Sequence, residues 1–408
     1  MSDHNADILI PGAGPAGCAC ALSLADTGLG IAVIDKVVFP RHKTCGDAIS
    51  TDTLNQLHKL PGTVWSNFDA ISEKLEIKGV RIVSPNEKTI DIRIESKKTS
   101  NPVGYIVRRT DFDYTLFSAM KSFPNIHVYE NTAITDVTIS NDRVTLLSEG
   151  QSFSGKIAAF ADGAHSIGAK QLAGHSHDPS HTCIAVQAYY ENVNGFHPDN
   201  YIELHFNRAI LPGYFWIFPA AGNTANVGIG ILESTILKKK INLRTALEEI
   251  IHNHPLVAHR FDKAVSISDL KGSVIPLGSR KRNISGNRFL LLGDAASLVY
   301  PLLGEGIGNA IRSGRFAAAQ IRECIKNNNF SATFNNNYDK SIYNSMWSEL
   351  HRYHSIQKLI RKPGAFNFVV KKMTGTNASR ELHLVVDDIP SVRNKLLNPL
   401  FYLRMLFR

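Results

Sequence analysis

Three glycines near the amino terminus constrain the fold of this chain more than any other feature of its sequence. Gly12, Gly14 and Gly17 have the spacing Gly-x-Gly-x-x-Gly and follow a short apolar segment. The next segment, 15–27, is rich in Ala, Leu and Cys and begins with proline, which is favoured in the first turn of a helix. This order predicts a strand, a tight turn and a helix.

A second apolar segment, 31–34, ends in Asp35 and completes a strand–helix–strand unit. The first two glycines of such a unit allow close approach of a diphosphate, and the third lets helix and strand pack closely. The helix amino terminus faces the phosphate charge, and Asp35 is placed to accept a hydrogen bond from a ribose hydroxyl. We therefore expect a dinucleotide site, with glycines that serve only packing as the alternative. The unit does not separate FAD from NAD.

A second candidate site lies far along the chain, where Asp294 ends an apolar segment and a Gly-rich turn, 304–308, opens a helical segment. A carboxylate at the end of a buried strand can hold the hydroxyls of a polyol chain. Backbone amides at a helix start can reach the pyrimidine edge of a flavin and stabilise its reduced anion. An Asp294 that merely caps a helix is the alternative.

Two β-rich blocks interrupt what would otherwise be one nucleotide-binding sheet. Alternating polar and apolar residues predict antiparallel strands there. The length of 408 residues allows discontinuous domains, and the hydrophobic fraction of 43% excludes disorder. We expect a discontinuous nucleotide-binding domain formed by residues 1–72, 108–180 and 283–330. A β-rich substrate domain would be formed by residues 73–107 and 181–282, and a helical, basic carboxy-terminal region by residues 331–408.

The formal net charge of +9 is concentrated at the carboxy-terminal end, where residues 351–408 contain 11 Lys or Arg and three acidic residues. Aromatic residues are interleaved with these cations, which suits an anionic membrane surface; a solvated basic tail packed on its own domain is the alternative. No nucleic-acid partner is expected, because the cations form no known nucleic-acid-reading motif.

Five scattered cysteines lack metal-ligand spacing, so no metal site is expected and a reduced, cytoplasmic protein is predicted. Cys18 and Cys20 are predicted to be packing residues of the first helix. No apolar segment is long enough to span a membrane, and the polar residues 1–6 leave no room for a signal peptide. The sequence does not indicate an oligomeric state.

Several segments resemble, in their order, FAD-dependent oxidoreductases of the p-hydroxybenzoate hydroxylase fold. They are the glycine motif, Arg109-Thr-Asp-Phe112-Asp113, Ala161-Asp162-Gly163-Ala164 and Gly293-Asp294. Within that group the chain resembles the geranylgeranyl reductase family through Pro40-Arg41-His-Lys43-Thr-Cys45-Gly46-Asp47, Tyr214-Phe-Trp216-Ile-Phe218-Pro219, Val227-Gly228-Ile-Gly230 and Gly304-Glu305-Gly306-Ile307-Gly308-Asn309-Ala310. The resemblance covers roughly residues 6–320.

The resemblance implies a mixed α/β fold, in which a Rossmann-like FAD-binding domain is interleaved with an antiparallel β-sheet substrate domain. It also implies a set of FAD-binding residues: Gly12, Ala13, Gly14, Pro15, Ala16, Gly17, Asp35, Lys36, Arg41, Cys45, Gly46, Asp47, Arg109, Ala133, Asp162, Asp294, Gly304, Gly306 and Ile307. Cys45 would lie beside the flavin as a candidate catalytic residue and proton donor, with an ordered water as the other candidate. The residues that would line the substrate cavity are Tyr214, Trp216, Phe218 and Pro219.

Each of these roles has a purely structural alternative. Cys45 could be a small buried residue without a redox task, and Arg109 could be half of a surface pair with Arg108. Trp216 and Phe218 alternate with Phe215 and Ile217, so half of this segment could be ordinary sheet core.

The activity that the resemblance implies is hydride transfer from reduced flavin to a C=C bond of a polyprenyl (geranylgeranyl-type) lipid or related isoprenoid. An isolated alkene is a poor hydride acceptor, so the site must exclude water and pre-position the chain at the flavin. NADPH or another reductant would supply the electrons. Because isoprenoids partition into membranes, the basic carboxy-terminal region would contact the inner membrane surface peripherally.

Two other functions remain open. One is a flavin-dependent monooxygenase or halogenase of the same fold, although Tyr214 and Phe218 depart from the Trp-x-Trp-x-Ile-Pro element of halogenases. The other is a non-enzymatic prenyl-binding protein that keeps the fold without flavin contacts.

Overall fold

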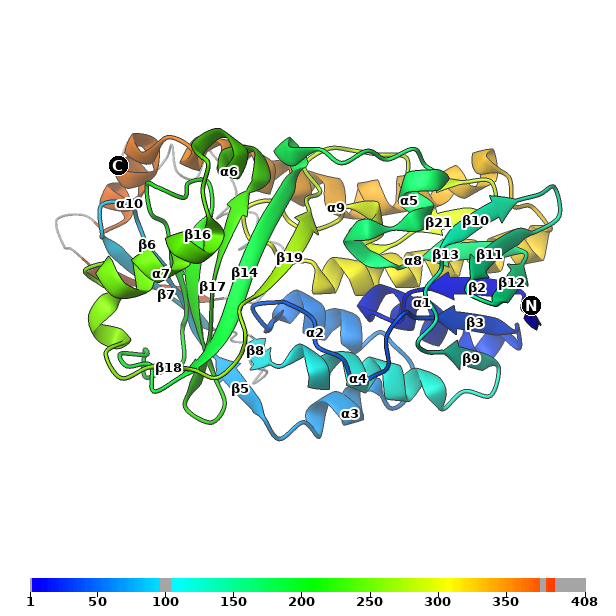
Figure 1. Cartoon of the computed structure of the whole chain (residues 1–408), viewed down its shortest axis with the longest axis horizontal. Coiled ribbons are helices and arrows are strands. Elements are labelled where there is room, and N and C mark those ends of the chain that lie inside the picture. Colours follow the sequence, from blue (N-terminus) through cyan, green and yellow to red (C-terminus); the bar gives the residue numbers. More distant parts are fainter. Residues whose placement is uncertain (1, 96–103, 375–378, 386–408) are drawn as a thin grey trace.

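The computed structural model describes residues 2–95, 104–374 and 379–385. These residues form two regions that lie end to end along the longest axis (Figure 1). One is built on a six-stranded sheet and the other on a nine-stranded sheet. We call them the six-stranded region and the nine-stranded region.

The sheet of the six-stranded region has the order β20-β21-β13-β2-β3-β9. Its strands are β2 (Ile8–Pro11), β3 (Ile31–Ile34), β9 (Ile126–Tyr129), β13 (Ile157–Phe160), β20 (Ser285–Gly286) and β21 (Phe289–Leu291). All neighbours are parallel except β20 and β21. The strand–helix–strand unit expected from the glycine motif is present as β2, α1 (Pro15–Leu24) and β3, with a 3₁₀ turn after α1. This order of parallel strands and crossover helix confirms the Rossmann-like expectation.

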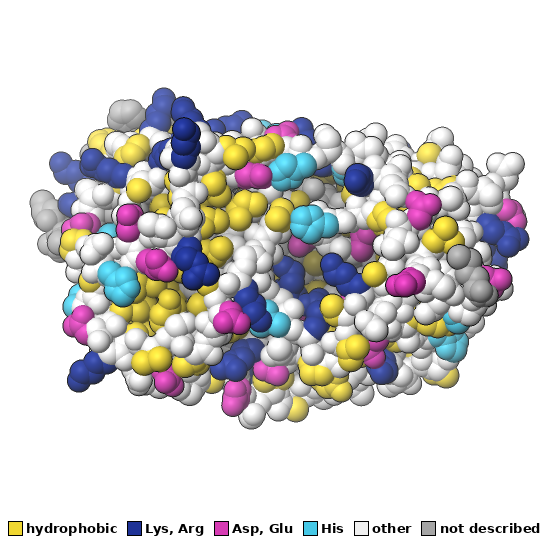
Figure 2. Space-filling model, viewed as in Figure 1, with side chains coloured by type: hydrophobic (Ala, Val, Ile, Leu, Met, Phe, Trp, Pro, Cys, Tyr) yellow, Lys and Arg dark blue, Asp and Glu magenta, His cyan; other side chains and the backbone are white. Residues whose placement is uncertain are grey.

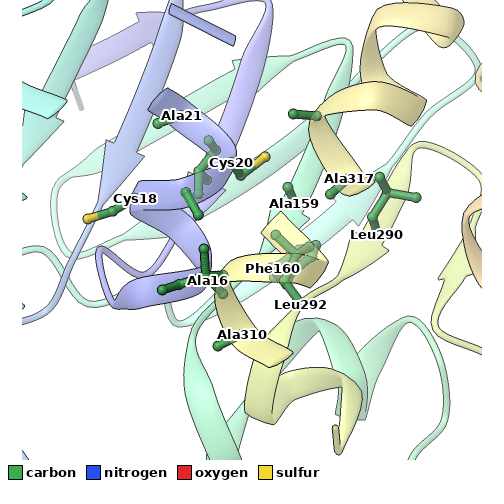
Figure 3. Close-up of a cluster of buried hydrophobic side chains, with 14 of the residues drawn as sticks. Ala16, Cys18, Cys20, Ala21, Ala159, Phe160, Leu290, Leu292, Ala310 and Ala317 are labelled. Atoms are coloured by element: carbon green, nitrogen blue, oxygen red, sulfur yellow. The ribbon is translucent and has the colours of Figure 1, made fainter. Parts of the chain in front are cut away.

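Helix α1 packs between this sheet and α8 (Ile307–Asn327), and small residues make the close contact possible (Figure 3). Cys18 and Cys20 are fully buried there, and burial raises the pKa of the Cys20 thiol to about 12. Both belong to the largest hydrophobic cluster, as expected for packing residues. The same region also contains α4 (Arg109–Lys121) and α5 (Ile167–Gln171).

A four-stranded sheet covers one end of this region, in the order β1-β12-β11-β10. Its strands are β1 (Ser2–Asn5), β10 (Asp136–Ile139), β11 (Val144–Ser148) and β12 (Gln151–Gly155). Strand β1 pairs in parallel with β12. Its polar residues gave no strand signal, because neither face of β1 is apolar and the pairing depends on a strand about 150 residues away.

The nine-stranded sheet has the order β18-β14-β17-β16-β15-β6-β7-β22, and β19 also pairs with β14. Its strands are β6 (Gly79–Val83), β7 (Thr89–Glu95), β14 (Thr182–Glu191), β15 (Ile202–His205), β16 (Tyr214–Ala220), β17 (Thr224–Leu232), β18 (Val265–Ser266), β19 (Lys271–Pro276) and β22 (Ser379–Val385). The sheet is mainly antiparallel, as expected, but β15 pairs in parallel with β6 and β22 with β7.

A small sheet of β4 (Ala48–Ser50), β8 (Gly104–Val107) and β5 (Lys74–Ile77) lies between the two regions. The remaining helices are α2 (Thr51–Leu57), α3 (Val64–Asp69), α6 (Glu233–Lys239), α7 (Leu243–Asn253), α9 (Ala332–Ile360) and α10 (Pro363–Thr374). Among the described residues, no helix combines the length and hydrophobicity that crossing a bilayer requires.

The carboxy-terminal region contains the expected helices and, in addition, one strand that the sequence did not predict. Helices α9 and α10 are present, but residues 379–385 form strand β22 along the edge of β7. Leucines two residues apart in this segment have the period of a strand rather than that of a helix. The last part of the basic segment, 386–408, lies outside the described residues.

Candidate functional site

A cavity of about 580 Å³ lies where the two regions meet, and residues from both line it. Its polar end is lined by turns and helix starts of the six-stranded region. Its apolar end is lined by one face of the nine-stranded sheet. Figure 2 shows Lys and Arg side chains gathered near the middle of the molecule, over this junction.

The three glycines of the amino-terminal motif have different surroundings. A Cβ atom on Gly17 would lie 1.9 Å from the carbonyl oxygen of Gly12, and one on Gly12 would lie 2.3 Å from that of Ala161. Gly14 instead lines the cavity, and the nearest atom to its hypothetical Cβ is Nη2 of Arg41 at 3.5 Å. Gly12 and Gly17 therefore permit backbone packing, whereas Gly14 leaves space for a ligand beside a cation.

Arg41 and Arg109 share one buried carboxylate at this end. Arg109 donates two hydrogen bonds of 2.8 Å to Asp113, whose second oxygen also lies 3.1 Å from Nη2 of Arg41. Burial opposes the charge of Arg109, but Asp113 outweighs it and raises the pKa of the guanidinium. Nη1 of Arg41 is buried without a hydrogen-bond partner. Two cations against one anion leave an excess positive charge that suits an anionic ligand.

Two helix amino termini face the same cavity without side-chain caps. Gly14 is the N-cap of α1, and Gly306 is the N-cap of α8. Gly304, Gly306, Ile307 and Asp294 line the cavity. Asp294 lies in a 3₁₀ turn that has no side-chain cap, so its carboxylate is not a helix cap there. Uncapped amides at a helix start are donors for a polar or anionic ligand.

Other predicted cofactor residues lie outside the cavity lining. Asp35 is buried at the end of β3, and its carboxylate accepts hydrogen bonds from Ala13 N at 2.7 Å and Val37 N at 3.1 Å. Ala133, like Lys36, is exposed. Asp162 accepts a hydrogen bond of 2.8 Å from Ile167 N, and burial raises the pKa of its carboxyl. Asp35 thus contacts the glycine turn through Ala13, whereas Asp162 is bonded to the start of α5. Neither carboxylate lines the cavity.

The segment Cys45-Gly46-Asp47 crosses from one region to the other. Cys45 and Gly46 line the cavity, whereas Asp47 lies behind it, 1% exposed and with a φ of 63°. Asp47 accepts hydrogen bonds from the Tyr189 hydroxyl and from Nδ2 of Asn226. Burial raises the pKa of Asp47 to about 6, and these two hydrogen bonds limit the rise.

Asn226 is the central residue of this contact and was not predicted from the sequence. Its Nδ2 also donates to the Cys45 carbonyl at 2.7 Å, and its Oδ1 accepts the indole N–H of Trp216 at 2.9 Å. One fully buried amide thus joins the Cys45 segment to the aromatic wall of the cavity. The only sequence signal was its position on the same face of β17 as Gly228 and Gly230, the glycines of the family motif.

Strand β16 has two faces, as its alternation suggested. Tyr214, Trp216 and Phe218 line the cavity, while Phe215 and Ile217 are buried in a separate cluster beneath α7. Pro219 is buried and is not part of the cavity lining. The Tyr214 hydroxyl donates to the Leu303 carbonyl, which ties the aromatic wall to the turn before α8.

The rest of the apolar end is formed by branched aliphatic side chains and by one glycine of β17, Gly230. The aliphatic residues are Ile77, Val80, Ile82, Ile92, Ile94, Ile202, Leu204, Leu232, Ile275 and Leu277. A Cβ atom on Gly228 would lie 2.3 Å from the Trp216 ring, so this glycine makes room for the indole. Gly230, in contrast, lines the cavity, and its hypothetical Cβ would meet nothing nearer than 3.6 Å.

Several polar residues of the lining were not predicted as site residues, and three of them lie on one wall: Lys43, Ser273 on β19 and Gln187 on β14. The others are Thr44, Ser50, Thr51, Asp52, Glu305 and Gln357. Lys43 lies inside the Pro40–Asp47 motif, so its place in that motif was the available signal. Gln187 and Ser273 are diagonal neighbours across β14 and β19, because Ser273 lies opposite Ala185. That juxtaposition depends on strand register, which no local pattern specifies.

Comparison with known proteins places this arrangement in a family. Residues 181–274 match the model of the geranylgeranyl reductase catalytic domain. The chain is 30% identical over 342 residues to a digeranylgeranylglycerophospholipid reductase of Thermoplasma acidophilum, over 82% of this chain and 83% of the relative. It is 28% identical over 334 residues to a menaquinone reductase of Mycobacterium tuberculosis, over 78% of this chain and 76% of the relative.

The fold agrees with these matches. The crystal structure of a geranylgeranyl bacteriochlorophyll reductase-like protein from T. acidophilum is similar to this one, with a TM-score of 0.82 and 25% identity over the full length of both chains. Fold and site define an FAD-dependent oxidoreductase. The chain belongs to the geranylgeranyl reductase family, which confirms the resemblance predicted from its motifs.

The described residues fit FAD, the cofactor of this family. The orphaned Nη1 of Arg41, the open space at Gly14 and the amides at the start of α1 suit a diphosphate. Asp294 and the amides at the start of α8 suit the ribityl chain and the flavin ring.

Proposed function

We propose that this protein saturates C=C bonds of a polyprenyl lipid. The observation that carries the proposal is a single cavity that joins a nucleotide-binding end to an apolar, aromatic end. The two relatives are named for lipids with different head groups that share a polyprenyl chain, and the apolar end is suited to such a chain. Bound FAD, once reduced by NADPH or another reductant, supplies a hydride.

The protein's own residues prepare the site for this reaction. Gly14, Arg41 and the start of α1 would hold the diphosphate, while Asp294 and Gly304–Ile307 would hold the flavin end. Trp216 and Phe218 exclude water and orient the lipid chain. This positioning lowers the activation free energy of the reaction. Asp47 and Asn226 lie outside the lining and fix the Cys45 segment against Trp216.

The decisive experiment is anaerobic incubation of the chemically reduced holoprotein with a geranylgeranyl lipid, followed by mass spectrometry. A product heavier by two hydrogen atoms per turnover supports the reductase. An oxygen-dependent product heavier by one oxygen atom would instead indicate a monooxygenase. A purified protein that neither binds FAD nor changes the lipid would indicate a prenyl-binding protein.

We also propose peripheral contact with the inner membrane surface through the turn between α9 and α10. Leu359 at the end of α9 and Phe368 on α10 are each 49% exposed, and residues 351–374 contain no acidic residue. Ile360, the last residue of α9, packs in the cluster that includes Trp216 and Phe218. Contact at this turn would bring the apolar end of the cavity close to the lipid. Co-sedimentation with anionic vesicles but not with neutral vesicles would support this contact.

A further inference from the structure

Saturating an alkene requires a proton as well as a hydride, and the cavity contains few groups that can give one. Arginine retains its proton in proteins, which excludes Arg41 and Arg109 as donors. The Tyr214 hydroxyl is engaged with a backbone carbonyl, and burial raises its pKa. Three carboxyl groups also line the cavity: Asp52 is paired with Arg312, Glu305 accepts a hydrogen bond from the Ser50 hydroxyl, and Asp294 belongs to the flavin end. The Lys43 ammonium and the Cys45 thiol are the remaining candidates. The inference below rests on the proposed function.

Lys43 lies at the junction of the two ends of the cavity. Its Nζ donates a hydrogen bond of 3.0 Å to Oγ of Ser273 and approaches the Thr44 carbonyl at 3.5 Å. No carboxylate of the described residues forms an ion pair with it. Its ammonium is therefore held by neutral acceptors beside Cys45.

The charges around Lys43 partly cancel one another. Asp294 favours the ammonium form from the six-stranded region, whereas Arg41 and Arg109 oppose it. The other ionisable groups nearby are Cys45 on the same loop, His42, and Lys271 on β19. Burial is the largest effect and lowers the pKa of Lys43, which makes the ammonium a stronger acid than an exposed lysine.

Gln187 supplies the second polar group of this wall. It is 1% exposed, and its Oε1 is buried without a hydrogen-bond partner. A buried acceptor without a donor is costly, so a donor that enters the cavity is expected to complete it. Gln187 lies diagonally across from Ser273, which holds the ammonium.

We propose that Lys43 is the proton donor of the reaction, that Ser273 positions its ammonium, and that Gln187 holds a bridging water beside it. As the hydride bonds to one alkene carbon, the π electron pair forms a new C–H bond at the other carbon with a proton delivered from Nζ through the water. Lys43 is left as the neutral amine and regains a proton from solvent. The flavin is oxidised and the alkene is reduced, with no further reactant.

The first test compares Lys43→Met and Lys43→Arg in single-turnover oxidation of the reduced flavin by a geranylgeranyl lipid. Both variants should be slower by about 100-fold or more, since arginine keeps the charge but does not release a proton. The wild-type rate should fall as pH rises through the pKa of Lys43, because only the ammonium is active. FAD affinity and the visible spectrum of the flavin should change little.

Two matched variants define the contrary outcomes. Lys271→Met removes a positive charge from an exposed residue outside the lining and should leave the rate unchanged. A Lys43→Arg rate equal to wild type would show that only the charge matters and would overturn the proposal. So would wild-type rates in both Lys43 variants together with a large loss in Cys45→Ser. A wild-type protein that yields no reduced lipid refutes the proposed function itself.

A second test needs no turnover. Competitive acetylation of lysines in the holoprotein, followed across pH by mass spectrometry, should show Lys43 becoming reactive at lower pH than Lys271. Ser273→Ala should shift the Lys43 curve to still lower pH, because the hydroxyl accepts from the charged form. Gln187→Leu should leave that curve in place and still slow turnover. Equal curves for Lys43 and Lys271 would contradict the assignment.

Discussion

The two sides of the cavity are built in different ways. The six-stranded side presents backbone, in the turn at Gly14 and in the starts of α1 and α8. The nine-stranded side presents side chains on the face of a sheet, with Trp216 and Gln187 as examples. A substitution on the first side therefore acts mainly through the packing of turns, whereas one on the second side acts through cross-strand neighbours. Residues that border the ligand space are therefore expected to tolerate substitution better than residues packed against a neighbouring backbone.

The largest expected effect separates two glycines of the same motif. Gly17→Ala should destabilise the holoprotein by about 3 kcal/mol or more, because the new Cβ would lie 1.9 Å from the Gly12 carbonyl oxygen. Gly14→Ala has only Arg41 near its new Cβ, so stability in urea should change by less than about 0.5 kcal/mol. Its effect should instead be weaker FAD binding, measured by equilibrium titration of the apoprotein.

Equal stability losses in Gly14→Ala and Gly17→Ala would break the distinction between packing and ligand space. Gly28→Ala is a suitable control for backbone strain alone. Gly28 has a φ of +69°, and no atom lies within 4 Å of its hypothetical Cβ. It should lose stability without losing FAD affinity.

The next effect concerns Asp47, which links the two sides. Its folded-state pKa of about 6 exceeds the ordinary 3.8, so its contribution to stability is fully present below about pH 4 and is lost as pH rises through 6. Asp47→Asn cannot ionise and should escape this loss. Relative to wild type, the variant should gain about 3 kcal/mol between about pH 4 and pH 7, measured by urea unfolding of the holoprotein. A pH-independent difference would show that folding does not raise the pKa of Asp47.

The glycine pair of β17 provides the matching test on the nine-stranded side. Gly228→Ala should cost about 1–3 kcal/mol, because its Cβ would overlap the Trp216 ring at 2.3 Å and the Val186 carbonyl oxygen at 2.5 Å. Gly230→Ala should be nearly neutral in stability, since its Cβ would meet only ordinary contacts. It should nevertheless reduce the rate with the polyprenyl lipid by narrowing the cavity. A stable Gly228→Ala with unchanged Trp216 fluorescence would contradict this packing.

What could be predicted from the sequence follows the same division. The glycine turn, Asp294 and the start of α8 were identified because each is local: a strand, a turn and a helix occur within a short segment. The alternation along β16 also predicted its two faces. Asn226, Tyr189 and Gln187 were missed, because their roles depend on the register of strands far apart in sequence. The edge pairing of β22 was missed for the same reason.

The smallest expected effect tests one hydrogen bond of the link between the sides. The Tyr189 hydroxyl donates to Asp47 and so favours the charged carboxylate. Tyr189→Phe should cost about 1 kcal/mol at neutral pH, where that charge is present, and much less at about pH 4, where it is not. The substitution should also raise the pKa of Asp47 further, so that the loss of stability with rising pH continues above pH 6. Tyr190→Phe is the control, because Tyr190 packs against Phe261 on the other face of β14. If Tyr189→Phe and Tyr190→Phe gave the same pH dependence, the Tyr189 hydroxyl would have no part in holding the Asp47 charge.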